Sequence, residues 1–172
     1  MTTLLLVRHG ETDWNAEGRL QGHTDRPLNE RGRRQARSLA EELAKREISA
    51  VYTSDLARAR QTADIVAAHL GLPVVVEADL REKNWGSWEG LTAAERERVA
   101  YEGETTEEHR ERTLRAVRRI ADCHPGRRVA VVTHGGSLRR VQAAVLGIAL
   151  PVMENCGIWV VAYEDGVFRP ID

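Results

Sequence analysis

The sequence predicts an α/β fold, a three-layer α/β/α sandwich with a mostly parallel central sheet. Short apolar runs of the kind that is buried on both faces of a sheet recur at residues 3–7, 50–53 and 129–133. Segments with apolar residues at helical spacing lie between these runs. Because strands and amphipathic helices alternate, we expect parallel β–α–β units, and we expect residues 1–172 to form a single domain.

The first strand and helix are predicted from a continuous apolar run and a capping residue. Residues 3–7 are apolar throughout, apart from Thr3, as in a strand covered by helices on both faces. Asn29 has a side chain suited to cap a helix over about 31–46. Apolar residues on one face of that helix follow the i, i+3, i+4, i+7 pattern.

The second strand, residues 50–53, leads into a second amphipathic helix. Ser54 or Asp55 is expected to cap this helix, and Gly71 is expected to end it. A third short strand follows at residues 73–76.

A polar stretch at residues 83–104 separates this half of the chain from the next helix. It contains two tryptophans and several glycines, and it is expected to be mostly irregular. Thr105 and Glu108 have the spacing of a capping box, which predicts a helix that runs to about Cys123.

The last part of the chain combines one more β–α unit with a closing hairpin. Residues 129–133 form a fourth buried strand, and Ser137 begins another helix. Residues 157–163 and 167–169 flank a Glu-Asp-Gly turn, which predicts two antiparallel strands. If residues 157–163 form an edge strand, they could pair across a homodimer; a monomer is the alternative.

Composition excludes several classes of protein. Apolar residues make up 42% and charged residues 30% of the chain, as in globular proteins. The net charge of −1 excludes a globally basic nucleic-acid binder. No apolar run approaches the ~20 residues of a membrane span, and no secretory leader is recognisable. Two cysteines without metal-ligand spacing favour a reducing, cytoplasmic location.

Four predicted strands deliver chemically active side chains to one edge of the sheet. The first strand leads into His9, the second into the helix that carries Arg58, the third toward Glu82 and the fourth into His134. Ligands of open α/β sheets bind beyond the carboxyl ends of the strands, so we expect these residues to converge. Each of these residues alone would more often be structural or exposed, and only their coincidence indicates a site.

The expected cluster suits a phosphate ester. Arginines bind phosphate oxygens through planar, permanently charged groups, and helix N-termini contribute backbone N–H donors. An imidazole can attack phosphorus, and neighbouring guanidinium groups lower its pKa and keep it neutral. Glu82 is the nearest carboxyl group that can protonate a leaving alcohol. These considerations do not decide which of His9 and His134 is the nucleophile.

Other chemistries lack a signature. There is no P-loop, no His-Glu-x-x-His or Cys-x-x-Cys metal motif, and no Gly-x-Ser-x-Gly elbow. The remaining histidines have no partner at a telling spacing and are expected to be surface or structural residues: His23, His69, His109 and His124.

Motifs in order along nearly the whole chain resemble those of the histidine phosphatase superfamily, also called phosphoglycerate mutase-like. The blocks are Leu6-Val7-Arg8-His9-Gly10-Glu11-Thr12, Arg19-Leu20-Gln21-Gly22, Ser54-Asp55-Leu56-x-Arg58-Ala59, Leu80-Arg81-Glu82, Gly86-x-Trp88-Glu89-Gly90 and Val132-Thr133-His134-Gly135-Gly136. The first block is moderately specific, and the full set is highly specific.

The resemblance implies the fold of that superfamily and a set of roles. His9 would be the nucleophile that forms a phosphohistidine, and Glu82 would be the proton donor and then the base that activates water. No metal or organic cofactor is expected. The implied phosphate- and substrate-binding residues are Arg8, Asn15, Gln21, Gly22, Arg58, His134 and Gly135.

The branch of the superfamily is predicted from the region that follows the tryptophan motif. Only residues 91–102 separate Gly90 from Gly103, whereas mutases of this type have an insertion there and a C-terminal tail over the site. A mutase must exclude water, and a shortened cap leaves the site open. We therefore expect a phosphatase of small phosphorylated metabolites. The alternatives are a cofactor-dependent phosphoglycerate mutase and a non-catalytic phosphate-binding module.

Two further features complete the prediction. Lys83 stands where an apolar residue is common in the superfamily, and it is expected to point outward, away from Glu82. Trp85 and Trp88 could stack on a ring-bearing substrate, but a packing role is expected. The sequence leaves the physiological substrate open.

Overall fold

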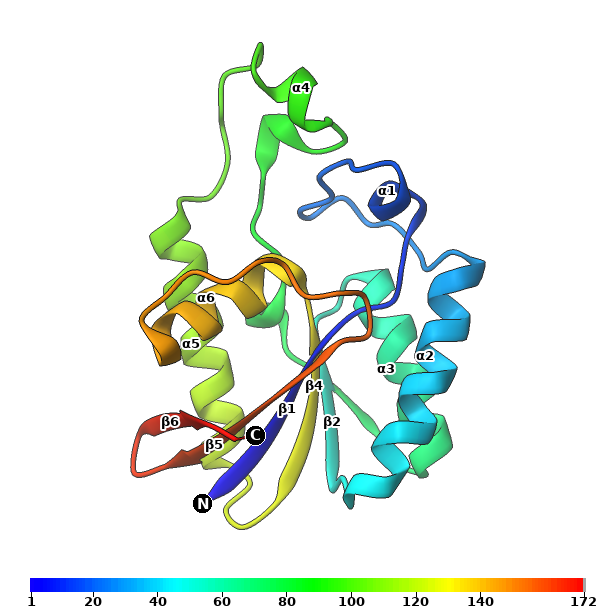
Figure 1. The fold of residues 1–172 in the computed structure, drawn as a ribbon, viewed down its shortest axis with the longest axis vertical. Helices are drawn as coiled ribbons and strands as arrows, with labels where there is room; N and C mark the ends of the chain where they lie inside the picture. Colours follow the sequence, from blue (N-terminus) through cyan, green and yellow to red (C-terminus); the bar gives the residue numbers. More distant parts are fainter. Residues whose placement is uncertain (172) are drawn as a thin grey trace.

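The fold is a six-stranded sheet with helices on both faces, seen in a computed structural model that describes residues 1–171 (Figure 1). The strand order is β3-β2-β4-β1-β5-β6. The first four of these run parallel, and β5 and β6 are antiparallel to their neighbours. The strands are β1 (Thr2–Arg8), β2 (Ala50–Thr53), β3 (Val74–Val76), β4 (Arg128–Thr133), β5 (Ile158–Glu164) and β6 (Val167–Pro170). The expected mostly parallel α/β architecture is confirmed.

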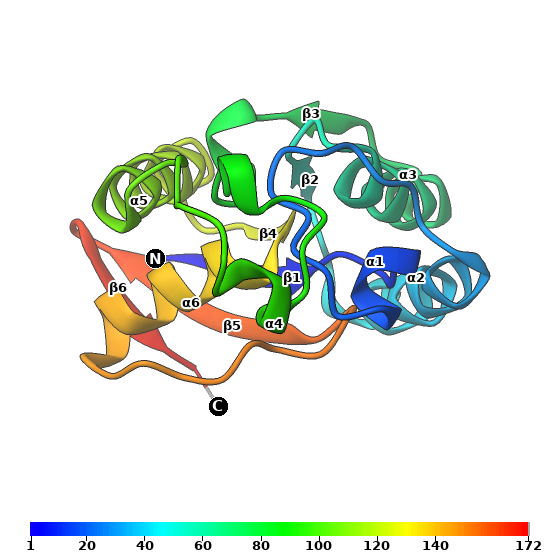
Figure 2. The same cartoon turned by 90° about the horizontal axis from the view of Figure 1, so that it is seen from above.

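Two pairs of helices cover the sheet. α5 (Thr106–Asp122) and α6 (Gly135–Leu146) lie on one face, and α2 (Glu30–Leu43) and α3 (Ala57–Leu70) lie on the other (Figures 1 and 2). None of the helices within residues 1–171 is long and apolar enough to cross a membrane.

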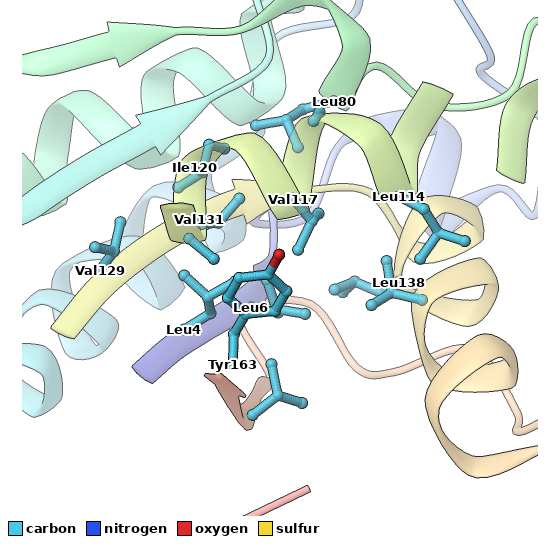
Figure 3. Close-up of a cluster of buried hydrophobic side chains, with 14 residues drawn as sticks. Leu4, Leu6, Leu80, Leu114, Val117, Ile120, Val129, Val131, Leu138 and Tyr163 are labelled. Carbon is cyan, nitrogen blue, oxygen red and sulfur yellow. The ribbon is translucent and has the colours of Figure 1, made fainter. Parts of the chain in front are cut away.

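The core follows from the alternation of side chains along β1. Leu4 and Leu6 pack with α5 and α6, whereas Leu5 and Val7 pack with α2 and α3. Figure 3 shows the first of these clusters, in which Leu4 and Leu6 lie among side chains of the neighbouring strand and helices. Each fully buried leucine contributes roughly 1.5–3 kcal/mol, so the two clusters hold the central strands firmly.

Strand register brings the ends of β1 and β4 together. Arg8 pairs with Thr133, the last residue of β4, and the His9 amide donates to the Thr133 carbonyl at 2.9 Å. Thr53, the last residue of β2, pairs with Val132. The strands β1, β2 and β4 therefore end at the same level of the sheet.

The segment beyond these strand ends forms a short cap. α1 (Asp13–Ala16) and α4 (Ala93–Arg96), together with the 3₁₀ turn η3 (Gly86–Trp88), lie past the carboxyl ends of the strands (Figures 1 and 2). The other 3₁₀ turns are η1 (Ala44–Arg46) and η2 (Ala78–Leu80). The sequence did not predict α1 or α4, because single-turn helices carry too few residues to show a periodic pattern.

Two predicted helix caps are confirmed, and one is wrong. Asn29 accepts from the Gly32 amide, and Thr105 forms a capping box with Glu108. The cap of α3 is neither Ser54 nor Asp55. These two side chains are engaged elsewhere, Ser54 with His134 and Asp55 with Arg81.

A residue distant in sequence caps α3 instead. The side chain of Asp25 accepts a hydrogen bond from the Ala57 amide at 2.6 Å. A cap that comes from another part of the chain leaves no local sequence signal, which explains the wrong prediction.

The boundaries of the last elements differ slightly from the prediction. α6 begins at Gly135, two residues before Ser137, with His134 at its N-cap position. The closing hairpin is confirmed, but β5 is not an edge strand, because it pairs with both β1 and β6. The edges of the sheet are β3 and β6. Residues 157–163 are therefore not free to pair across a dimer.

Candidate active site

A cavity of about 320 Å³ opens at the carboxyl ends of the parallel strands. The predicted site residues that line it are Arg8, His9, Asn15, Gln21, Gly22, Arg58, Glu82 and Gly135. His134 is fully buried and does not line the cavity, but its ring centroid lies 5.2 Å from that of His9. The structure thus brings together residues from four strand ends and from the loop that follows α1.

His9 is held in one orientation by its own neighbour. It is 3% exposed, and its Nδ1 lies 2.6 Å from the carbonyl oxygen of Gly10. A carbonyl oxygen only accepts hydrogen bonds, so Nδ1 must carry a proton. In the neutral ring this leaves the lone pair on Nε2, the nitrogen that can act as a nucleophile.

Burial and positive charge keep the two site imidazoles neutral. The pKa of His9 is well below its usual value of 6.5, because burial and the guanidinium groups of Arg58 and Arg8 disfavour a second proton. The pKa of His134 is also lowered well below 6.5, by burial and by Arg58. Both rings are therefore uncharged near neutral pH.

Arg58 is fully buried in the first turn of α3. Its guanidinium donates to the carbonyl oxygens of Gly22 at 2.6 Å and Thr24 at 3.1 Å, which ties the loop after α1 to the sheet edge. Burial lowers the pKa of Arg58 to about 10, so the group still carries its charge near neutral pH.

Arg8 projects from the end of β1, where its guanidinium donates to the carbonyl of Met153. The first residue of α6 lies against it. A Cβ at Gly135 would come within 2.6 Å of Val152 and 3.3 Å of Arg8 Nε, so only glycine fits without displacement.

Three buried nitrogens around His9 have no hydrogen-bond partner among the described residues. They are Arg8 Nε, Arg58 Nε and His134 Nδ1. His134 Nε2 lies 2.7 Å from Ser54 Oγ, and when that hydroxyl donates, Nδ1 carries the ring proton. The two arginine Nε atoms are N–H donors in either case, and buried donors are nearly always satisfied, so their lack of a partner favours an anion in this part of the site.

Two backbone N–H groups hold the carboxylate of Glu82 in place. One carboxylate oxygen accepts from the Gly136 amide at 2.8 Å, and the other accepts from the Lys83 amide at 2.7 Å. A Cβ at Gly136 would lie 2.2 Å from the carboxylate, so this glycine is required for the approach. The side chain is 13% exposed, within reach of a ligand in the cavity.

Arg112 holds the backbone that carries Glu82. Its guanidinium donates to the carbonyl oxygens of Arg81 and Glu82, both at 2.7 Å, and it pairs with Glu104 at 2.6 Å. The sequence analysis did not identify Arg112, because one arginine among several on α5 has no distinguishing spacing.

His109 also lies at the site. It is 1% exposed, with Nε2 2.9 Å from Ser137 Oγ and 3.7 Å from the carboxylate of Glu82. Burial lowers the pKa of His109 to about 4, so the ring is neutral. The sequence analysis placed His109 among the surface or structural histidines. Its contacts with the site could not be predicted, because Ser137 and Glu82 belong to other parts of the chain.

The expectation that Lys83 points outward is wrong. The residue is 8% exposed and lines the cavity. Its ammonium lies 4.6 Å from the ring of Trp85 and 4.9 Å from the ring of Tyr101, and it donates to Thr106 Oγ at 3.2 Å. Aromatic faces attract a cation, and the short cap places two of them beside Lys83.

Trp85 and Trp88 pack against each other, with nearly parallel rings 6.3 Å apart. Tyr101 meets both of them edge-on. Their packing with one another fits the role that the sequence analysis expected. Trp85 also lines the cavity, with Lys83 against its face.

The loop after α1 is braced by the side chains of Gln21 and Glu89. Gln21 accepts from the Thr12 hydroxyl at 2.7 Å, whereas Asn15 accepts from the Thr12 amide at 3.2 Å within the capping box of α1. Glu89 accepts from the amides of His23 and Thr24 at 2.8 and 2.7 Å. The loop is thus held in place before any ligand binds.

The described residues, 1–171, contain no group of three or more histidine, cysteine or acidic side chains arranged to hold a metal ion. The polar atoms that face the cavity are mainly cationic or N–H donors. This donor set suits an anion.

Comparison with known proteins places the chain in a family. Residues 4–170 match the sequence profile of the histidine phosphatase superfamily (branch 1). The chain therefore belongs to this superfamily, and the resemblance found in its motifs is confirmed.

Relatives within the superfamily include phosphatases and mutase-like proteins. The chain is 44% identical to phosphoglycerate mutase-like protein 4 and to metal-independent phosphoserine phosphatase, both from Arabidopsis thaliana. These matches cover 79% and 82% of this chain, and 67% of each relative. A mycobacterial glucosyl-3-phosphoglycerate phosphatase complexed with VO₃ superimposes with a TM-score of 0.87, at 31% identity, over 97% of this chain and 95% of that one.

Proposed function

We propose that the protein hydrolyses phosphomonoesters of small metabolites through a phosphohistidine at His9. The observation that carries the proposal is the neutral His9 ring, whose Nε2 lone pair is free and close to the charges of Arg58 and Arg8. A phosphoryl group bound to Nε2 would place its oxygens near these charges. Guanidinium groups would also stabilise the charge that develops on its oxygens in the transition state.

In the first step, the Nε2 lone pair of His9 attacks phosphorus, and the bond between phosphorus and the ester oxygen breaks. Glu82, in its protonated form, gives its proton to the departing oxygen, which leaves as an alcohol. The hydrogen bond from Nδ1 to the Gly10 carbonyl stabilises the positive charge on the phosphorylated ring.

In the second step, a water molecule attacks the phosphorus of the phosphohistidine. Glu82, now a carboxylate, takes one proton of that water, and the phosphorus–nitrogen bond breaks. Inorganic phosphate and neutral His9 result, and Glu82 is again protonated for the next cycle. Gly136 and Arg112 would keep Glu82 at the right place in both steps.

A mutase is the alternative function, and the name of one mutase-like relative favours it. The cap argues for hydrolysis. Its helices, α1 and α4, have only four residues each, and only residues 91–102 separate Gly90 from Gly103. A mutase must shield its phosphohistidine from water, which needs a larger cover.

The first experiment is phosphate release from p-nitrophenyl phosphate. The wild-type protein should turn over, and His9→Ala should lose at least about 10³-fold in kcat. The matched control is His69→Ala, since His69 is exposed at the far end of α3. Protein denatured in alkaline SDS during turnover should carry phosphate on His9, because the phosphorus–nitrogen bond is stable in base and is hydrolysed in acid.

Three outcomes would contradict the proposal. Full activity of His9→Ala would remove the nucleophile. Interconversion of phosphoglycerates with little phosphate release would favour the mutase. Tight phosphate binding without turnover of any ester would leave a binding module.

A further inference from the structure

The cavity is larger than a phosphoryl group needs. At ~30 Å³ per water molecule, 320 Å³ corresponds to about ten waters. Its lining continues past Glu82 onto α6, where Gly136, Arg139 and Arg140 face the cavity at positions i, i+3 and i+4. Lys83 belongs to the same lining. The cavity therefore has room for a substrate that extends beyond its phosphate.

This outer part of the cavity is strongly cationic. Seven arginine and lysine side chains line the whole cavity, against the single carboxylate of Glu82. Among residues 1–171, no ion pair includes Lys83, Arg139 or Arg140. The Arg139 side chain donates to the carbonyl of Leu150 at 2.9 Å, whereas the Arg140 side chain makes no hydrogen bond within the described residues. Like charges without acidic partners repel, and an anion between them removes that repulsion.

Lys83 is already fixed for such a role. The rings of Trp85 and Tyr101 and the hydroxyl of Thr106 hold its ammonium beside the cavity, so little side-chain freedom is left to lose when a ligand binds. Burial and the nearby charge of Arg140 lower the pKa of Lys83, whereas the carboxylates of Glu104 and Glu82 act in the opposite direction.

We propose that Lys83 and Arg140 form a second anion-binding subsite, and that the preferred substrates are phosphomonoesters with a second anionic group, either a carboxylate or another phosphate. This inference rests on the proposed function, because it takes the first phosphate to be bound at His9. It narrows the substrate class that the sequence left open. Sugar monophosphates without a second charge are predicted to be poor substrates.

A stacking site for an aromatic ring is the competing interpretation of the same wall. The Trp85 ring is not free for it, since Lys83 lies over the ring and Trp88 packs parallel to it at 6.3 Å. This side of the cavity therefore offers a ligand the positive charge of Lys83 rather than a free aromatic face.

The test compares 3-phosphoglycerate with glycerol 3-phosphate, which differ in a carboxylate against a hydroxymethyl group. The ratio of their kcat/KM values should exceed about tenfold, which corresponds to 1.4 kcal/mol of charge-assisted bonding. A second pair, fructose 1,6-bisphosphate and fructose 6-phosphate, shows whether a phosphate is accepted in place of the carboxylate.

Variants assign the preference to the proposed residues. Arg140→Gln should reduce the ratio about tenfold, and Lys83→Gln should do the same. Lys83→Arg should retain most of the preference. It serves as the readout if the glutamine variant folds poorly. Arg37→Gln on the exposed face of α2 removes the same charge from the surface and should leave the ratio unchanged.

The result is separable from the proposed function. Dissociation constants for the same ligand pairs, measured in His9→Ala, report the subsite without any turnover. Equal affinities for both members of each pair, or a ratio unaffected by Arg140→Gln, would overturn the subsite even if His9-dependent hydrolysis of p-nitrophenyl phosphate is observed. A carboxylate preference in His9→Ala would support the subsite even if the proposed hydrolysis fails.

Discussion

At the scale of single residues, the same two arginines belong to the proposed phosphate site and act on the proposed nucleophile. Arg8 and Arg58 contribute donors without partners to the space beside His9, and their charges help to keep its ring neutral. Arg58 is fully buried, so little water screens its charge, whereas Arg8 is half-buried and lines the cavity.

The protonation state of His9 is open to direct measurement. Because the pKa of His9 lies well below 6.5 in the folded protein, the ring should stay neutral as the pH falls from 7.5 through 6.5. Nitrogen NMR of labelled histidine should show Nδ1 protonated and Nε2 bare across this range. In urea the same ring should titrate near pH 6.5. A folded-state midpoint at or above 6.5 would contradict the assignment of a neutral nucleophile.

Residues differ in how far sequence alone could place them. His9, Arg58 and His134 could be located because each follows a strand that the apolar pattern identifies. Lys83 and His109 could not, because their surroundings come from the cap and from α5 and α6. A side chain whose partners are distant in sequence leaves no local pattern to analyse.

At the scale of elements, the first turn of α6 both begins a helix that packs on the sheet and contributes a backbone donor to the candidate site. The amide of Gly136 lies in the first turn and binds the Glu82 carboxylate, as expected where a helix N-terminus meets an anion. The other end of the helix is closed by Gly147 in the left-handed conformation, with φ of 71°. Glycine is therefore needed at position 136 to leave room for the Glu82 carboxylate, and at position 147 for its left-handed backbone.

Alanine at each position should separate these reasons. Gly136→Ala pushes a Cβ to 2.2 Å from Glu82 and should lower kcat for an alkyl phosphate by about 10²-fold, with little loss of folding stability. Gly147→Ala meets no atom within 4 Å, but its backbone strain should cost about 1–2 kcal/mol. Steady-state kinetics and thermal unfolding of both variants provide the comparison. An unchanged kcat in Gly136→Ala would argue against the role proposed for Glu82.

At the scale of the whole molecule, the sequence predicts the layers better than the surroundings of the site. Apolar runs and helical periodicity depend on burial, which the entire sheet imposes on residues such as Leu4–Val7. The position of β5 in the sheet and the Asp25 cap of α3 depend on which segments meet in space. Because the parallel strands pair in register, their predicted carboxyl ends lie at one edge of the sheet, and the general position of the site could be predicted. The structure of the cap could not be predicted.

Three buried imidazoles, those of His9, His109 and His134, make the stability of the whole molecule depend on pH. Their pKa values in the folded protein lie below the value of 6.5 expected in the unfolded chain, and that of His109 is about 4. Below pH 6.5 the unfolded chain therefore binds more protons than the folded protein. Stability is complete above this pH and is lost as the pH falls toward the folded-state values.

Urea unfolding between pH 7.5 and 5 should show this loss, at up to about 1.4 kcal/mol per pH unit for each of the three histidines. Carboxylates with lowered pKa values, such as Glu104, contribute only near and below 4.5, outside this window. His109→Gln removes one of the three groups and should reduce the slope by about one proton. The same slope in this variant would show that His109 takes up its proton inside the folded protein. Constant wild-type stability down to pH 5 would show the same for all three rings, and would contradict the lowered pKa values on which the neutral His9 is argued.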